Sequence, residues 1–444
     1  MARHVTPEKL GELLASESIS REEVVELLKT LLQRCPDCVR ALEQVLAEFR
    51  AGAPEPRQIA RAFAPALARI DSKLDALSRA KSLAEREFRS LVKLPAAERR
   101  LRISRSHRRF RNPVLVDLLV EESRRRVTEQ PFVAHELAEC AVDVAMRLPV
   151  AEVGQAWAMT LIAQAQGQRG NALRATGDFR GAEGILAFAH QLFEQEGNGD
   201  PLVEAELLQL TATLRREQRR FEEAEQALDT ATELYRSCGD ASQAARILVK
   251  RGFVYYEAGQ PERAVEVTRQ ALPSIDGARD PRLLLCAQHN LVWFLEQAGR
   301  LEEARQLLDQ VQSLYDQFGD PGTQLRRQWV VGRIARGLGE RERAEQALTA
   351  TRLGFLSQGL GFDSALVGLD LALLYIELGR PNEVKRLAEE MVPIFLMQDI
   401  HREATAALLL FQEAARQEAA TVPMVAQLIA YLERVRKGSK DLVS

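Results

Sequence analysis

The sequence contains little of what most catalytic or membrane-spanning proteins require. Its 444 residues include only six dispersed histidines, and its five cysteines are too scattered for a disulfide framework. It has no glycine-rich phosphate loop and no Gly-x-Ser-x-Gly nucleophile elbow. No uncharged apolar run approaches the roughly 18 residues of a membrane span, and the N-terminus lacks a signal-peptide core. We therefore expect a non-catalytic, cytoplasmic protein that has no cofactor and does not contact a membrane.

Charge of one sign and strand signals are also scarce. The formal net charge is −3, although 28% of the residues are charged, so no global attraction to nucleic acid or membrane is expected. No run of alternating apolar and polar residues predicts a β-strand. Apolar residues make up 46% of the chain, enough to bury a continuous core. These features predict an all-α protein.

One short pattern returns at a fixed interval. A glycine is followed five residues later by a small residue, as in Gly259 and Ala264. The small position advances by 40 residues at each step after a first step of 42, through Ala182, Ala224, Ala264, Ala304, Ala344 and Val384. Such a period is typical of a repeat array.

Each period predicts a helical hairpin. An amphipathic segment precedes Gly259, which permits the positive φ that ends a helix. Pro261 is tolerated at the first position of the next helix, and Ala264 allows that helix to approach the first one closely. A second set of residues lies seven positions after the small ones, and the next hairpin must pack against it. These residues are Ala231, Ala271, Val311 and Thr351.

The hairpins resemble tetratricopeptide repeats, whose first helix carries a small residue and a bulkier one three positions later. The corresponding pairs are Gly170/Leu173, Ala212/Arg215, Gly252/Tyr255, Val292/Leu295, Gly332/Ala335 and Ala372/Tyr375. The resemblance implies a right-handed superhelical solenoid preceded by a small helical N-terminal unit. The expected parts are a small helical unit (1–50), a helical connector (58–112), a degenerate hairpin (113–148), the repeat array (150–417) and a capping helix (418–436).

The same resemblance implies a concave groove lined by the first helices, which would bind a protein or peptide. Amides and guanidinium groups suit peptide backbone and carboxylates, and aromatic rings are frequent anchors. Alternatively, the aromatic side chains pack between hairpins, or the N-terminal segment fills the groove. The predicted groove residues are Asn171, Arg174, Arg216, Lys250, Phe253, Tyr256, His289, Asn290, Trp293, Trp329, Arg333 and Arg336.

Residues 1–50 resemble the zinc-binding domain of anti-sigma factors. His4, Cys35 and Cys38 match three of the four ligand positions of that domain, and Leu31 occupies the fourth. Because a structural zinc site normally has four protein ligands, we expect a metal-free remnant. The alternatives are a retained zinc ion and a redox pair. This resemblance makes a sigma factor an alternative partner and transcription regulation an alternative function.

An arginine-rich run is the one marked local charge bias. Seven arginines occur within 13 residues that contain no acid: Arg99, Arg100, Arg102, Arg105, Arg108, Arg109 and Arg111. The run predicts either a solvated face that forms ion pairs with the acid-rich repeats or a patch for an acidic protein or phosphates. Aromatic residues for stacking on bases do not accompany it, which disfavours nucleic acid.

Overall fold

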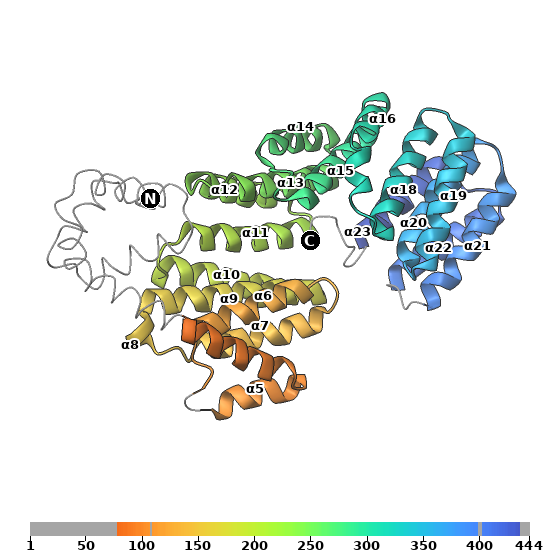
Figure 1. Ribbon diagram of the computed structural model, residues 1–444. Helices are drawn as coiled ribbons and strands as arrows, with labels where there is room; N and C mark the ends of the chain where they lie inside the picture. Colours follow the sequence, from red (N-terminus) through yellow and green to blue (C-terminus); the bar gives the residue numbers. More distant parts are fainter. Residues whose placement is uncertain (1–77, 107–108, 398–401, 436–444) are drawn as a thin grey trace, which may run out of the picture.

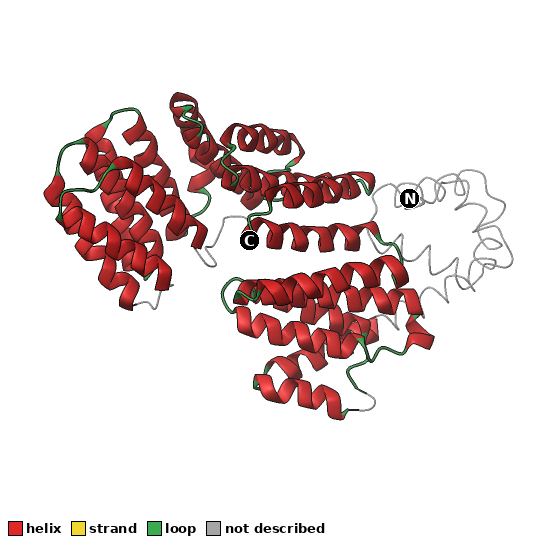
Figure 2. Ribbon diagram, turned by 180° about the vertical axis from the view of Figure 1, so that it is seen from behind, coloured by secondary structure: helices red, strands yellow, loops and turns green. Residues whose placement is uncertain are grey.

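The computed structural model describes residues 78–106, 109–397 and 402–435. All regular structure in these residues is helical, and no strand occurs among them (Figure 2). The prediction of an all-α chain is therefore confirmed.

The helices follow one another along an elongated, curved body (Figure 1). Residues 78–92 form a helix, and the helices after it are α5 (Ala96–Arg105), α6 (Pro113–Arg126), α7 (Pro131–Ala145), α8 (Val150–Val153), α9 (Gln155–Thr176), α10 (Phe179–Glu196), α11 (Pro201–Glu217), α12 (Phe221–Ser237), α13 (Ala241–Glu257), α14 (Pro261–Ala271), α15 (Pro281–Gln297), α16 (Leu301–Gln310), α17 (Gln312–Asp316), α18 (Pro321–Gly337), α19 (Arg341–Ser357), α20 (Gly361–Glu377), α21 (Pro381–Met397), α22 (Arg402–Arg416) and α23 (Val422–Val435).

The repeated hairpins pair α9 with α10, α11 with α12, α13 with α14, α15 with α16, α18 with α19, and α20 with α21. The glycines of these turns adopt the left-handed region, with φ of 76° at Gly259 and 78° at Gly339, whereas Arg219 takes this conformation, with φ of 62°, between α11 and α12. Only glycine enters this region without steric cost, which explains its place in the repeated pattern. The small residues that follow, such as Ala264 and Ala344, are fully buried between helices.

A second 40-residue period, which the sequence analysis did not use, starts several first helices. Asp240 and Asp280 accept hydrogen bonds from the backbone N–H groups of Gln243 (2.9 Å) and Leu283 (3.0 Å). Asp200 and Asp320 cap α11 and α18 in the same way. Aspartate is favoured at this position because its carboxylate satisfies a free N–H group of the first turn.

The first helices lie on the inner side of the curve. Along the array, α9 contacts α11, α13 contacts α15, and α15 and α20 both contact α18, whereas the second helices make no comparable contacts with one another in the described chain. Because, among the described residues, the first helices of successive hairpins contact one another and the second helices do not, the stack is concave on the side of the first helices. We call the surface formed by α9, α11, α13, α15, α18 and α20 the inner surface.

Helix α23, the predicted capping helix, packs beside the last repeated hairpin and also reaches the inner surface. It packs on α20 and α22, whereas α22 packs on α21. Its dark blue ribbon passes behind α18 and α20 in Figure 1. Val425, Leu428 and Leu432 of α23 are buried in the hydrophobic cluster that contains Leu369 and Leu373 of α20. The C-terminal helix therefore covers part of the inner surface.

Candidate binding surface on the first helices

The inner surface has two parts that differ in burial. Towards the N-terminus, on α9, α11 and α13, the side chains of Arg174, Arg216, Lys250 and Phe253 are half-buried. Towards the C-terminus, on α15 and α18, several of the predicted groove residues are fully buried. The two parts are therefore described separately.

The C-terminal part is built around one buried arginine. Arg333 is 7% exposed and pairs with Asp370 of α20 at 3.3 Å and with Glu296 of α15 at 3.2 Å. Its guanidinium carbon lies 4.6 Å from the centre of the Trp293 ring. The indole N–H of Trp329 donates to Asp370 at 2.6 Å. These contacts join three neighbouring first helices through charges that solvent does not screen.

The prediction that the groove residues line an open wall is therefore wrong for part of the set. Trp329 and Arg333 are satisfied by Asp370 and its neighbours inside the protein. The other fully buried members of the predicted set are Asn171, His289 and Asn290. For Trp329 and Arg333 no local pattern could indicate this burial, because it depends on the positions of α20 and α23.

The remaining predicted residues are half-buried and mostly engaged within the array. Arg174 pairs with Glu217, and Arg336 pairs with Glu377 at 3.5 Å. Phe253 meets the ring of Phe294 edge-on, with ring centres 5.5 Å apart. The aromatic residues thus support the alternative reading, in which rings pack between hairpins.

Lys250, on α13 in the N-terminal part, differs from the arginines around it. Its Nζ donates to the amide oxygen of Gln209 on α11 at 2.9 Å, and no described carboxylate lies within ion-pair distance of it. The Gln209 side chain also donates from Nε2 to the hydroxyl of Tyr235 at 2.8 Å. This second bond fixes the amide so that its oxygen faces the lysine.

Three arginines lie near enough to Lys250 for their charges to act on its pKa. Burial first, and then the charges of Arg246, Arg216 and Arg124, lower its pKa to about 8. Arg246 is held by Asp280 at 2.6 Å, so it is positioned by the same aspartate that caps α15. The cluster concentrates positive charge on adjoining first helices and leaves the ammonium group without a counter-ion among the described residues. Sequence reasoning placed Arg216, Lys250 and Gln209 on this wall but did not assign Arg124 and Arg246 to it, because these two arginines come from other repeat positions.

The burial of His289 should make the stability of the protein sensitive to acid. Its Nδ1 lies 2.6 Å from the hydroxyl of Tyr315, and burial, with a smaller contribution from Arg326, lowers its pKa to about 3. Since an unfolded histidine titrates near 6.5, the unfolded chain takes up a proton between about pH 6.5 and 3 that the folded chain does not. Stability should fall as the pH decreases through this range, by up to about 1.4 kcal/mol per pH unit.

Urea denaturation at several pH values checks this expectation. We expect His289→Gln, which keeps a hydrogen-bonding group near Tyr315, to flatten the dependence of unfolding free energy on pH between 6.5 and 4. Equal slopes in the two proteins would show that His289 is not the group responsible.

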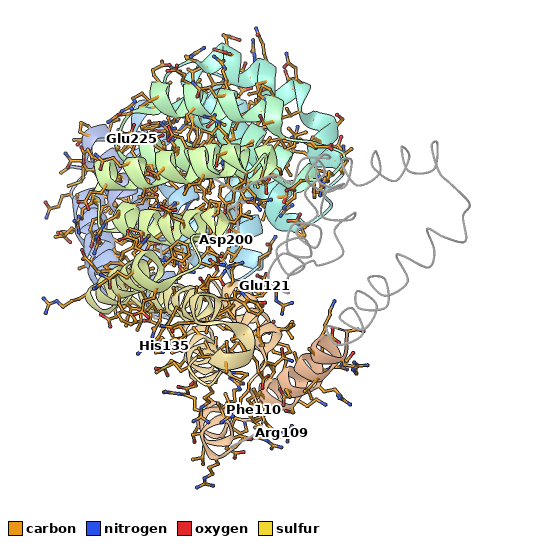
Figure 3. All side chains as sticks on the ribbon, turned by 90° about the vertical axis from the view of Figure 1, so that its left-hand side faces the viewer. Arg109, Phe110, Glu121, His135, Asp200 and Glu225 are labelled. Atoms are coloured by element: carbon orange, nitrogen blue, oxygen red, sulfur yellow. The ribbon has the colours of Figure 1, made fainter. Side chains whose placement is uncertain are left out.

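The arginine-rich run does not form one basic surface. Arg99 is buried and donates from Nε to the carbonyl oxygen of Leu94 at 3.0 Å, while Arg100 pairs with Glu139 and Asp143. Arg109 lies over the ring of the adjacent Phe110, where Figure 3 labels both residues. Arg102, Arg105 and Arg111 are exposed, and Arg108 lies outside the described residues. Two members of the run, Arg99 and Arg100, attach α5 to α7 through ion pairs, and the exposed members face solvent, as in the solvated or ion-paired alternative.

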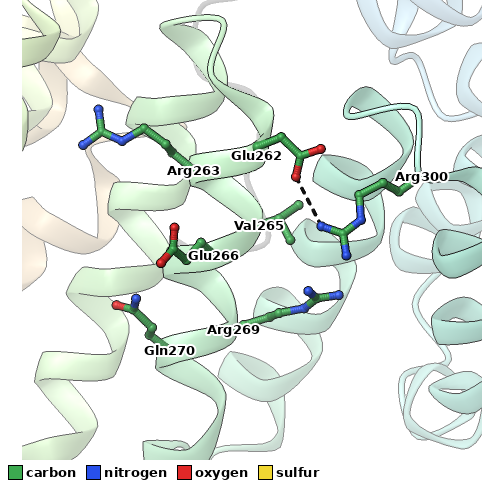
Figure 4. Close-up of a pocket in the computed structure, with 7 residues that line it drawn as sticks. All are labelled: Glu262, Arg263, Val265, Glu266, Arg269, Gln270 and Arg300. Carbon is green, nitrogen blue, oxygen red and sulfur yellow. Dashed lines mark hydrogen bonds and ion pairs between the residues drawn. The ribbon is translucent and has the colours of Figure 1, made fainter.

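An open pocket of about 600 Å³ lies on the outer side of the array, along α14 (Figure 4). Its cations face acids: Arg300 pairs with Glu262 at 3.2 Å, and Arg269 pairs with Glu303. Arg263 pairs with Glu225 at 2.7 Å. Because each guanidinium already has a carboxylate, this pocket offers no free charge to a ligand.

The described part of the chain contains no group of three or more histidine, cysteine, aspartate or glutamate side chains arranged to hold a metal. The predicted ligands His4, Cys35 and Cys38 lie outside the described residues. Within the described residues, no helix has the length and apolar character needed to span a bilayer.

The repeated hairpins and their converging first helices define a solenoid of tetratricopeptide-like repeats. Residues 161–237 match the Tetratricopeptide repeat family. No curated protein matches the sequence.

Two solved structures show the same fold at low sequence identity, and a third is a weaker match. A Rap protein complexed with Competence and Sporulation Factor has a TM-score of 0.52 and 14% identity, over 73% of this chain and 87% of that one. The apo form of RapI also has a TM-score of 0.52 and 14% identity, over 72% and 86%. NprR in complex with its cognate peptide NprX has a TM-score of 0.48 and 15% identity, over 72% and 87%.

Proposed function

We propose that this protein is a non-catalytic scaffold that binds an acidic segment of another protein on the N-terminal part of its inner surface. A tetratricopeptide-like solenoid is suited to protein–protein interaction, because its stacked first helices present a long concave wall. A Rap protein, which is similar in fold, has been crystallised in complex with Competence and Sporulation Factor.

The observation that carries the proposal is the state of Lys250. Its ammonium group lies among three arginines, and its one described partner is the neutral amide of Gln209. A carboxylate from a partner would relieve the mutual repulsion of these cations and accept charge-assisted hydrogen bonds. The arginines pair with carboxylates of this chain, such as Glu206 for Arg124 and Asp280 for Arg246, so an added acid would complete the cluster at Lys250.

Peptide binding to the full-length protein tests this function. One peptide library contains 12-residue peptides rich in aspartate and glutamate. A second library contains the same peptides with asparagine and glutamine in place of the acids. We expect acidic peptides to bind at least about tenfold more tightly than their amide counterparts, and Lys250→Met to remove most of that difference. Arg343→Gln on the outer helix α19, where Arg343 pairs with Glu340, is the matched control and should bind normally.

The affinity should also depend on pH. Because the pKa of Lys250 is lowered to about 8, its positive charge is lost as the pH rises from 7 to 9.5, whereas peptide carboxylates and arginines stay ionised. Binding of acidic peptides should weaken over this range in the wild-type protein and change little in Lys250→Met. Equal binding of acidic and amide peptides at pH 7 would refute the proposal.

A further inference from the structure

Helix α23 has the pattern of a helical ligand docked in a groove. Its buried residues are spaced at i, i+3, i+4 and i+7, and they are Val425, Leu428, Ile429 and Leu432. They join the hydrophobic cluster that includes Leu366, Leu369 and Leu373 on the inner side of α20. An amphipathic helix that lays such a stripe on a concave apolar wall uses a common mode of partner recognition.

The other end of α23 makes a polar contact far along the array. The hydroxyl of Tyr256, on α13, donates to Glu433 of α23 at 3.2 Å across 177 residues of sequence. Burial and the charge of Glu433 both raise the pKa of Tyr256, so the hydroxyl stays protonated and able to donate. The helix therefore spans from α20 to α13 and covers the residues predicted to line the C-terminal part of the groove.

Glu433 of α23 also acts on the buried charge of Arg333. Burial alone would lower the pKa of Arg333, but Asp370, Glu296 and Glu433 together raise it. Three carboxylates thus face one guanidinium, and two of them already bond to it without α23. Docking of α23 brings Glu433 close to Arg333, whose positive charge attracts this third carboxylate in addition to the bond from Tyr256.

The connection to the rest of the chain is short and exposed. Residues 417–421 join α22 to α23, and four of these five residues are exposed. Glu418 has a positive φ of 57°, and it pairs with Lys385 at 2.7 Å. A short, solvent-exposed link of this kind can pivot without unfolding either helix.

We propose that α23 is an intramolecular ligand of the inner surface, an autoinhibitory helix whose release exposes a docking site for an amphipathic helix of a partner. The site would consist of the apolar face of α20 together with Tyr256, Trp293 and Arg333. The partner helix would carry an apolar stripe with the spacing of α23 and an acid in the place of Glu433. The inference extends the proposed function, since it adds regulation of the same inner surface.

The test uses the full-length chain and a fluorescent peptide with the sequence of residues 418–436 as the probe. Leu432→Asp places a charge in a fully buried position and should release α23. We expect the folded variant to bind the peptide with one-to-one stoichiometry, and the wild-type protein, whose site is filled, to bind at least tenfold more weakly. A folded Leu432→Asp protein that fails to bind the peptide, or equal binding by both proteins, would overturn the proposal.

A milder pair of substitutions covers the case in which Leu432→Asp does not fold. Tyr256→Phe with Glu433→Gln removes the polar contact and keeps the shape of both side chains. Amide hydrogen exchange in residues 422–435 should become several-fold faster than in the wild type, whereas Gln427→Glu on the exposed face of α23 should leave it unchanged. Unchanged exchange in the double variant would contradict a releasable helix. Neither experiment involves Lys250, so these outcomes are independent of the acidic-peptide test.

Discussion

Replacing Asp370 with alanine should destabilise the protein by about 3–5 kcal/mol, the range measured when one partner of a buried ion pair is removed. Asp370 is 1% exposed and accepts hydrogen bonds from both Trp329 and Arg333. Alanine leaves the indole N–H without its acceptor and leaves the guanidinium with Glu296 as its close carboxylate partner. The cost is large because water cannot replace the lost bonds at a buried site.

Urea denaturation measures the total effect, and amide hydrogen exchange locates it. We expect faster exchange in α18 and α20, because hairpins in a solenoid depend mainly on their immediate neighbours. Asp370→Asn, which keeps an acceptor oxygen but no charge, should cost less. Glu302→Ala breaks an exposed ion pair with Arg305 and should change stability by less than about 1 kcal/mol. A similar small change in Asp370→Ala would show that the buried network does not hold these helices together.

Phe294→Ala is expected to cost about 3–5 kcal/mol, as is usual for large cavities in a well-packed core. The Phe294 ring is 0% exposed, meets Phe253 edge-on and stacks with Tyr256, with both pairs of ring centres 5.5 Å apart. A side-chain carbon on Gly252 would lie 2.6 Å from the hydroxyl of Thr268 on α14 and 3.0 Å from this ring, so glycine allows α13 to pack closely against both α14 and α15. The cavity would remove the support of Tyr256 as well as apolar contacts.

Two measurements separate the loss of apolar packing from the loss of support for Tyr256. Phe188→Ala deletes an equally large ring that is 48% exposed on α10, and it should cost much less than Phe294→Ala in the same denaturation assay. Hydrogen exchange of α23 should accelerate in Phe294→Ala alone, since Tyr256 links this ring to Glu433. The prediction fails if both alanine variants are equally stable.

The repeat pattern predicted the hairpins well because its physical requirements are local. Gly259 ends one helix through its own backbone angle, and Ala264 is small because two helices of the same hairpin touch there. Asp240 and Asp280 are equally local signals, since each bonds to an N–H group three residues away. They were available in the sequence and would have given the starts of α13 and α15.

The candidate site was predicted only in part. The position of Lys250 on the wall of first helices followed from the repeat register, but the arginines around it come from α6, α11 and α13. Trp329 and Arg333 also occupy first-helix positions, yet Asp370 and α23 bury them. A repeat period states which face of a helix turns inward, and it carries no information about what covers that face.

The sequence by itself determined that this protein is a stack of helical hairpins, because each amphipathic pair can bury its apolar side only against a neighbour. Only the tertiary structure decided which inward side chains a partner can reach. The reason is that the contact between Tyr256 and Glu433 joins residues 177 positions apart, and a contact of that range depends on the curvature of the whole array.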